Sequence, residues 1–147
     1  MREPTSSEQD GAIRMTGSSG GDCPFCSLDS SRVIAANDHA LAIYDGFPVS
    51  PGHCLIIPKR HIASFFEATK EEQAALLDLL EESRMIIIDE HSPDDFNVGI
   101  NDGTTAGQTV MHLHIHLIPR YIGDMPDPRG GVRWIFPEKA VYWKSLE

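Results

Sequence analysis

Residues 111–120 read MHLHIHLIPR, so three histidines, His112, His114 and His116, alternate with aliphatic residues. Successive side chains of a β-strand point to opposite faces, so this alternation predicts a strand over 111–119 with all three imidazoles on one face. A rise of about 3.3 Å per residue would space them roughly 6–7 Å apart. Three histidines are unusual on a bare solvent face and in a core, and histidine clusters often mark sites. The triplet is therefore the first candidate for a functional site.

The triplet permits more than one chemistry. A neutral imidazole can attack phosphorus when its far nitrogen donates to a carbonyl, and flanking imidazoles can then assist the leaving group. Alternatively, three histidines two residues apart can bind a catalytic zinc ion that keeps one position open for water. A non-enzymatic nucleotide-binding module would use overlapping residues. The residues alone leave these three alternatives open.

The segments before the triplet predict an α+β fold with a mainly antiparallel sheet. A capping box formed by Thr69 and Glu72 begins one long amphipathic helix, which ends at Ser92 and Pro93. Short apolar runs bounded by turn residues predict further strands over 32–37, 40–44, 53–58 and 96–101. Strands, then a helix, then strands is the order typical of an α+β domain.

The chain has 147 residues, of which 41% are hydrophobic, and this predicts one compact domain. Residues 1–22 are rich in Ser, Gly and charge, so we expect a disordered tail there. The catalytic domain is expected over 23–120. Residues 121–147 are rich in Pro and Gly but carry several aromatic residues, so we expect an arm that packs on the domain or on a second subunit.

The formal net charge of −10 argues against nucleic-acid and membrane-surface partners, which require clustered Lys and Arg. A small phosphate ligand stays possible, because backbone N–H groups and histidines can hold it locally. The sequence has no spanning apolar run and no signal-peptide pattern, so we expect a cytoplasmic protein.

Cys23 and Cys26 form a C-x-x-C pair, and Cys54 lies alone in an apolar run. The pair has the spacing of metal ligands, but two thiolates do not complete a tetrahedral zinc site. A redox pair is the alternative, and the spacing leaves both open. Cys54 is expected to be a small buried hydrophobe.

With these residues in view, the sequence resembles the histidine triad family, whose motif is three histidines alternating with hydrophobic residues. The resemblance covers about residues 23–120. It includes Asp45, the stretch HCLIIPKRH over 53–61, Asn101, the stretch GQT over 107–109, and the triplet itself. The ordered combination is much more specific than the triplet alone.

The resemblance implies an α+β subunit, commonly a homodimer, that needs no organic cofactor. It would bind a nucleoside monophosphate, most simply AMP, and cleave or transfer it from phosphoramidates or dinucleoside polyphosphates. By position, His114 is the expected nucleophile that forms a nucleotidyl-histidine, and His116 would assist at the leaving atom. The remaining matches are expected to bind substrate: Asn101, Gln108 and Thr109 at the phosphate, Asp45 at the ribose, and His53 near the site. From spacing alone, Asp45 is equally a turn residue ahead of Gly46.

The resemblance also implies a partner pair for the cysteines. Some bacterial members of the family, and the related uridylyltransferases, are similar to this chain in combining such a cysteine pair with two histidines. The matching positions are His61 and His112, which together with Cys23 and Cys26 would form a closed Cys₂His₂ site for structural zinc.

Overall fold

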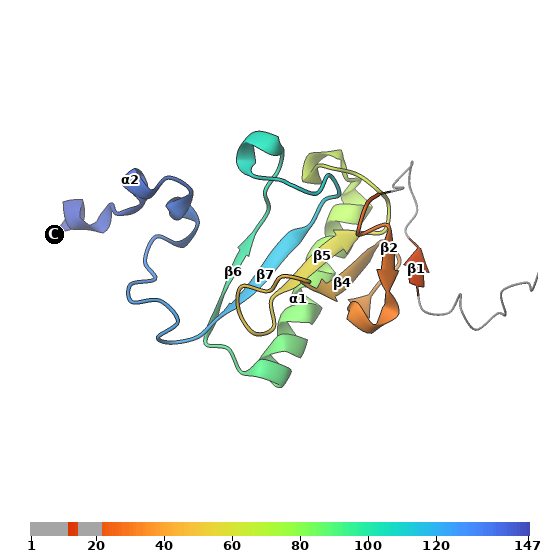
Figure 1. The fold of residues 1–147 in the computed structure, drawn as a ribbon, viewed down its shortest axis with the longest axis horizontal. Coiled ribbons are helices and arrows are strands. Elements are labelled where there is room, and N and C mark those ends of the chain that lie inside the picture. Colours follow the sequence, from red (N-terminus) through yellow and green to blue (C-terminus); the bar gives the residue numbers. More distant parts are fainter. Residues whose placement is uncertain (1–11, 15–21) are drawn as a thin grey trace, which may run out of the picture.

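The computed structural model describes residues 12–14 and 22–147, and its centre is a five-stranded antiparallel sheet with one long helix on one face (Figure 1). The strand order is β3-β4-β5-β7-β6. The strands are β3 (Val33–Ala36), β4 (Ala40–Tyr44), β5 (Cys54–Pro58), β6 (Asp95–Gly99) and β7 (Ile115–Arg120). The α+β class predicted from the sequence is confirmed.

The long helix α1 (Lys70–His91) begins and ends where the sequence predicts. Thr69 accepts a hydrogen bond from the Glu72 backbone N–H, and the Glu72 carboxylate accepts one from the Thr69 backbone N–H, which completes the capping box. The helix ends at Ser92, which adopts the left-handed conformation with φ of 51°. The buried side of α1 packs Leu76, Leu79 and Ile87 against the sheet.

The two faces of the sheet are buried against different segments, because side chains alternate along each strand. On the α1 face, Ala42, Ile56 and Ile115 share a cluster with the helix. Cys54 is fully buried on this face beside Ile87, as a small hydrophobe would be. The opposite face, formed by Leu41, Ile43, Leu55 and Ile57, is covered by Phe25 and Leu28.

The covering segment begins at the cysteine pair and runs into β2 (Ser27–Asp29), which pairs with β1 (Ala12–Arg14) in a small separate sheet. Thus three residues of the expected tail form a strand, while residues 1–11 and 15–21 lie outside the described residues. The short 3-10 helices of the domain are η2 (Ser30–Arg32), η3 (Phe65–Glu67) and η4 (Thr104–Ala106).

The strand predicted over 111–119 is wrong at its beginning, since β7 starts only at Ile115. The pairing of β5 with β7 ends at Ile56 and Ile115. Beyond that pair the backbone N–H of Leu113 donates to the carbonyl of Ile62 instead, at 2.7 Å. Only His116 therefore belongs to a strand, and the expectation of three imidazoles in a row on one strand face does not hold.

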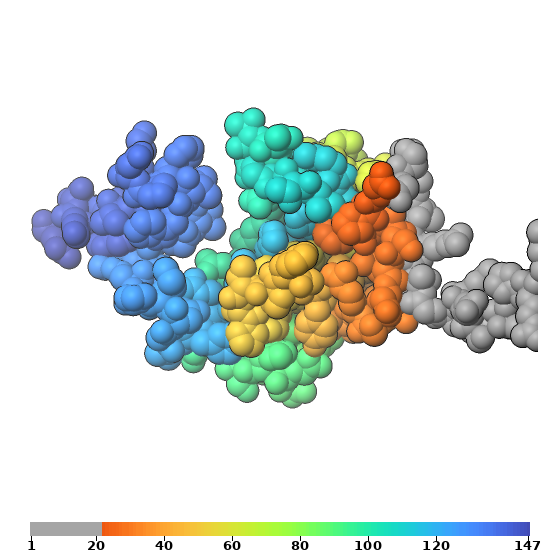
Figure 2. Space-filling view, in the orientation of Figure 1, coloured from red at the N-terminus to blue at the C-terminus, as the bar shows by residue number. Residues whose placement is uncertain are grey.

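Residues 121–147 extend past the β6 edge of the sheet and stand apart from the loop over 101–110 (Figures 1 and 2). They form η5 (Gly131–Ile135), α2 (Pro137–Ala140) and η6 (Trp143–Leu146), and η5 touches β6. Several large apolar side chains of this segment are exposed: Ile122, Val132, Ile135, Phe136 and Leu146. Across the described residues, no helix has the length and apolar character that a membrane crossing needs, and the cytoplasmic location stays a prediction.

Candidate active site and metal centre

His114 is buried, with 8% of its surface exposed, and its ring is oriented by the backbone. Its Nδ1 lies 2.8 Å from the carbonyl oxygen of His112. A carbonyl oxygen only accepts hydrogen bonds, so Nδ1 of His114 carries the proton and Nε2 keeps its lone pair. This is the tautomer that a nucleophilic imidazole requires.

His116 lies beside His114, with ring centroids 5.1 Å apart, and it also contacts His53. Its Nδ1 is 2.9 Å from Nε2 of His53, and that same nitrogen of His53 is 3.4 Å from a carboxylate oxygen of Asp45. Burial, together with the neighbouring His114 and His53, lowers the pKa of His116 to about 4, although Asp45 opposes the shift. Burial also lowers the pKa of His53, although Asp45 opposes the shift. His116 is therefore neutral near pH 7.

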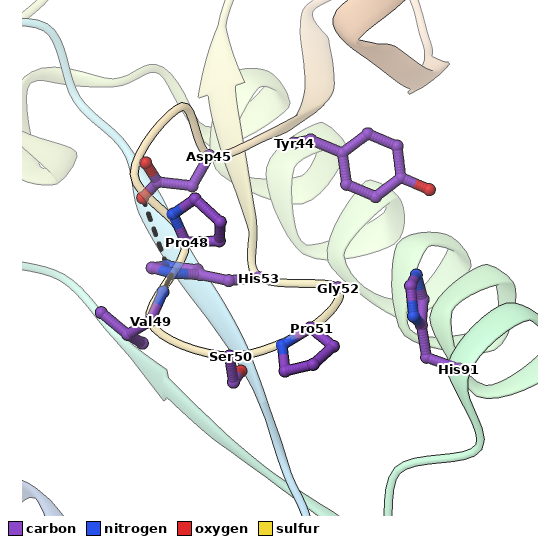
Figure 3. Close-up of a pocket in the computed structure, with 9 residues that line it drawn as sticks. All are labelled: Tyr44, Asp45, Pro48, Val49, Ser50, Pro51, Gly52, His53 and His91. Carbon is purple, nitrogen blue, oxygen red and sulfur yellow. Dashed lines mark hydrogen bonds and ion pairs between the residues drawn. The ribbon is translucent and has the colours of Figure 1, made fainter.

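Asp45 and His53 flank the loop that joins β4 to β5, and this loop borders a cavity of about 630 Å³ (Figure 3). The cavity is lined by Tyr44, Asp45, Pro48, Val49, Ser50, Pro51, Gly52, His53 and His91. One carboxylate oxygen of Asp45 accepts the Phe47 backbone N–H at 2.8 Å, while the other faces His53. Asp45 thus acts as a turn residue and also presents an oxygen at the site.

The loop over 101–110 places the three expected phosphate ligands differently. The Gln108 side chain is buried, accepts the Gly103 N–H at 2.8 Å and donates to the carbonyls of Ala63 and Val110. Its amide therefore holds the loop in shape. Asn101 and Thr109 are exposed, so their side chains are accessible to a ligand.

The four expected metal ligands come together, although they lie far apart in the sequence. Nδ1 of His61 is 3.0 Å from Nδ1 of His112 and 3.0 Å from the Cys26 sulfur. Nδ1 of His112 is 3.4 Å from the Cys23 sulfur and 3.6 Å from that of Cys26. Ligand atoms of a tetrahedral zinc ion are separated by roughly 3.4–3.8 Å, so the two distances from His112 to the cysteines match such a site and the two distances from His61 are shorter.

The orientation of His112 also suits a metal. Its Nε2 lies 2.9 Å from the carbonyl oxygen of Pro58, so Nε2 carries the proton and Nδ1 keeps the lone pair that a metal needs. Burial lowers the pKa of His112 to about 4, which keeps the ring neutral. The four residues can therefore hold a metal ion.

Phe25 joins this cluster to the candidate nucleophile. Its ring lies between the two cysteines in the sequence and makes edge contacts with His112 at 5.8 Å and His114 at 5.4 Å between centroids. Phe25 was not predicted from the sequence, and neither were the carbonyls of Pro58 and His112 that orient the rings. The apolar residue inside the cysteine pair was the available signal for Phe25; nothing in the sequence marks a particular carbonyl.

The structure does not favour a single ion held by the whole triplet. Within the described part of the chain, two groups of donor atoms lie close enough to share an ion: Cys23, Cys26, His61 and His112, and Asp45, His53 and His116. His114 belongs to neither group. The three rings of the triplet face three different partners, which separates their roles.

Comparisons with known proteins identify the family that the chain resembles. A model of the HIT domain matches residues 29–123. The chain is 37% identical over 103 residues to Protein hit of Bacillus subtilis, covering 67% of this chain and 71% of that protein. It is 33% identical over 102 residues to AP-4-A phosphorylase of Mycobacterium tuberculosis, covering 69% of this chain but only 52% of that protein. A crystal structure of a zinc-bound histidine triad family protein from Mycobacterium smegmatis superposes with a TM-score of 0.58 and 30% identity, covering 78% of this chain and 87% of that one.

Proposed function

The chain belongs to the histidine triad (HIT) family, and from this membership we propose that it is an enzyme which removes a nucleoside 5′-phosphate from its substrate through a nucleotidyl-histidine on His114. Family membership supports nucleotide hydrolysis or transfer in general. The observation that carries the specific proposal is the 2.8 Å contact from Nδ1 of His114 to the His112 carbonyl, which leaves Nε2 as a free nucleophile.

The reaction takes two displacements at phosphorus. The Nε2 lone pair of His114 forms a bond to phosphorus, the bond to the leaving atom breaks, and its electron pair departs with that atom. Water or another acceptor then attacks the same phosphorus and returns the electron pair to Nε2. Asn101 and Thr109 would contact phosphate oxygens from their exposed positions, and Asp45 would accept hydrogen bonds from the ribose hydroxyls.

Dinucleoside polyphosphates and phosphoramidates of AMP are the proposed substrates. The relative named AP-4-A phosphorylase supports the first class, but this chain spans about half of that protein's length. Both substrate classes are therefore included in the test below.

We also propose a structural zinc ion at Cys23, Cys26, His61 and His112. The donor set of two thiolates and two imidazoles, gathered within 4.8 Å of one another, suits tetrahedral zinc, and the zinc-bound relative from Mycobacterium smegmatis supports the assignment. The ion would join the segment before β2 to the residues that precede β7. It would stabilise the fold rather than enter the chemistry.

The proposed assembly is a homodimer in which residues 121–147 contact the second subunit. Exposed apolar side chains on this segment and the exposed edge strand β6 support it, because both are surfaces that proteins usually cover.

The test is AMP release from adenosine 5′-phosphoramidate and from a diadenosine polyphosphate, with wild type and His114→Ala compared. We expect turnover of at least one substrate by wild type, none by His114→Ala, and AMP affinity within about threefold in both, since the variant removes only the nucleophile. Retained turnover in His114→Ala would show that His114 is not the nucleophile. Binding of AMP without turnover of either substrate by wild type would instead indicate a binding module.

A further inference from the structure

The backbone N–H of Val49 fixes the protonation pattern of His53. It donates to Nδ1 of His53 at 3.1 Å. A backbone N–H cannot accept, so Nδ1 of His53 must present its lone pair, and the neutral ring carries its proton on Nε2. The loop holds the donor in place, because the Asp45 N–H donates to the His53 carbonyl at 3.0 Å and the His53 N–H to the Ser50 carbonyl at 3.1 Å.

The proton on Nε2 of His53 in turn fixes the protonation pattern of His116. The Nε2–H of His53 points at Nδ1 of His116 across 2.9 Å, while the Asp45 oxygen is more distant at 3.4 Å. Nδ1 of His116 is then the acceptor, and the single proton of its neutral ring sits on Nε2. A chain of two hydrogen bonds therefore runs from a backbone amide to His116.

The donor atoms of Asp45, His53 and His116 lie within 4.8 Å of one another, but these two hydrogen bonds are incompatible with a metal ion there. A metal on Nε2 of His53 would need a lone pair there while Nδ1 accepts from Val49, which requires an imidazolate. A histidine ligand normally donates from its other nitrogen to an acceptor. His112 does this towards Pro58, whereas His53 does the opposite.

We propose that His53 is a positioning residue that fixes His116 as a neutral Nε2–H donor to the leaving atom. Adjacent rings thereby hold opposite tautomers: His114 presents a lone pair at Nε2, and His116 presents a proton at Nε2. This inference rests on the proposed function. The leaving atom departs with the electron pair of its bond to phosphorus, the proton stays on His116, and water supplies the proton that the product finally takes up.

The hydrogen bond from His116 matters in proportion to the charge that develops on the leaving atom. A poor leaving group, such as the oxygen of an alkyl alcohol, develops much charge when no proton is transferred to it. A good leaving group, such as p-nitrophenolate, stabilises its own charge. Loss of the positioning contact should therefore slow the first class far more than the second.

The first test reads the tautomers directly, by long-range ¹H–¹⁵N NMR of protein with ¹⁵N-labelled histidine. The chain has seven histidines, so the signals can be assigned by single substitutions. We expect an Nδ1–H tautomer for His114 and Nε2–H tautomers for His53 and His116. His53→Leu should leave His116 with a mixture of tautomers, whereas His53→Gln, whose amide N–H₂ can donate in place of Nε2–H, should retain the Nε2–H form. An Nδ1–H tautomer of His116 in wild type would overturn the proposal whether or not the protein turns over a substrate.

The second test is kinetic, with adenosine 5′-phosphate esters of an alkyl alcohol and of p-nitrophenol. We expect His53→Leu to lower kcat for the alkyl ester by roughly tenfold to a hundredfold and for the p-nitrophenyl ester by less than threefold, with His53→Gln recovering most of the loss. Equal losses on both esters would show that His53 acts only on the fold. If wild type turns over neither ester but the NMR tautomers are as expected, the proposed function fails while the hydrogen-bond chain stands.

Discussion

The carbonyl oxygen of Pro58, at the end of β5, lies 2.9 Å from Nε2 of His112 and directs the opposite nitrogen of that ring to the cysteine pair. The carbonyl oxygen of His112 itself accepts the Nδ1–H of His114 at 2.8 Å. One residue thus belongs to the proposed zinc site through its side chain and orients the proposed nucleophile through its backbone. The metal centre and the active site share a support but not their chemistry.

Substitution of a metal ligand should remove zinc and destabilise the protein. We expect Cys26→Ala to lower the zinc content from one ion per chain to near zero, because three donors leave a tetrahedral site incomplete. The melting temperature should fall by several degrees, since metal binding contributes directly to folding. Elemental analysis and calorimetry measure both quantities. Cys54→Ala is the control, because Cys54 is buried on the α1 face away from the cluster, and it should keep the ion. A full complement of zinc in Cys26→Ala would contradict the site.

Removal of the ion should reduce turnover without abolishing it. If zinc is structural, protein stripped by a chelator and assayed well below its melting temperature should retain a measurable fraction of wild-type kcat, and far more than His114→Ala retains. If the triplet held a catalytic ion, the stripped protein would lose turnover completely and zinc would restore it. AMP release and circular dichroism on the same samples separate loss of chemistry from loss of fold.

The beginning of α1 should govern acid stability. Hydrogen bonds from Arg60 lower the pKa of Glu72 to about 2, against an ordinary value of 4.5. A carboxyl with a lowered pKa in the folded state contributes stability that is fully present above about pH 4.5 and is lost as the pH falls towards 2. Glu72→Gln should therefore lower the free energy of unfolding at pH 6 and flatten its decline below pH 4.5. Thr69→Ala should lower the free energy of unfolding by about 1 kcal/mol both at pH 6 and below pH 4.5. Urea unfolding across this range measures these effects, with the exposed neighbour Glu71→Gln as the control. The same acid slope in Glu72→Gln and Glu71→Gln would refute this account.

Local signals predicted the fold well, and long-range contacts explain where the prediction failed. Thr69 and Glu72 are three residues apart, so the start of α1 could be recognised from the sequence. The alternation over 111–119 could not show where pairing with β5 ends, because that depends on how the chain turns after Pro58. The four proposed zinc ligands were predicted through family resemblance, and the structure brings their donor atoms within 4.8 Å of one another. The tautomers of His53, His114 and His116 depend on backbone groups that only the folded chain brings together.

Asp45 should select for ribose hydroxyls if it binds them. Asp45→Asn keeps an oxygen that can accept the Phe47 N–H, so the turn should survive, but it removes the charge that strengthens hydrogen bonds from hydroxyls. We expect its affinity for AMP to fall roughly tenfold, and its affinity for 2′,3′-dideoxy-AMP to match that of wild type. Isothermal titration with both ligands gives the comparison. An equal loss on the dideoxy ligand would assign Asp45 to the turn alone.

The segment over 121–147 should hold the proposed dimer together. Ile135 and Phe136 are 72% and 63% exposed, so in a single subunit they leave apolar surface facing water. We expect wild type to sediment as a dimer. The double variant Ile135→Ser with Phe136→Ser should raise the dimer dissociation constant at least tenfold. This factor represents roughly 1.4 kcal/mol, and two buried apolar side chains together contribute more than that. Phe66→Ser is the matched control, because Phe66 is also exposed but lies on η3, in a different part of the chain. A monomeric wild type would refute the dimer, whereas a dimer unchanged by the double variant would place the interface elsewhere, with the β6 edge as the next surface to substitute.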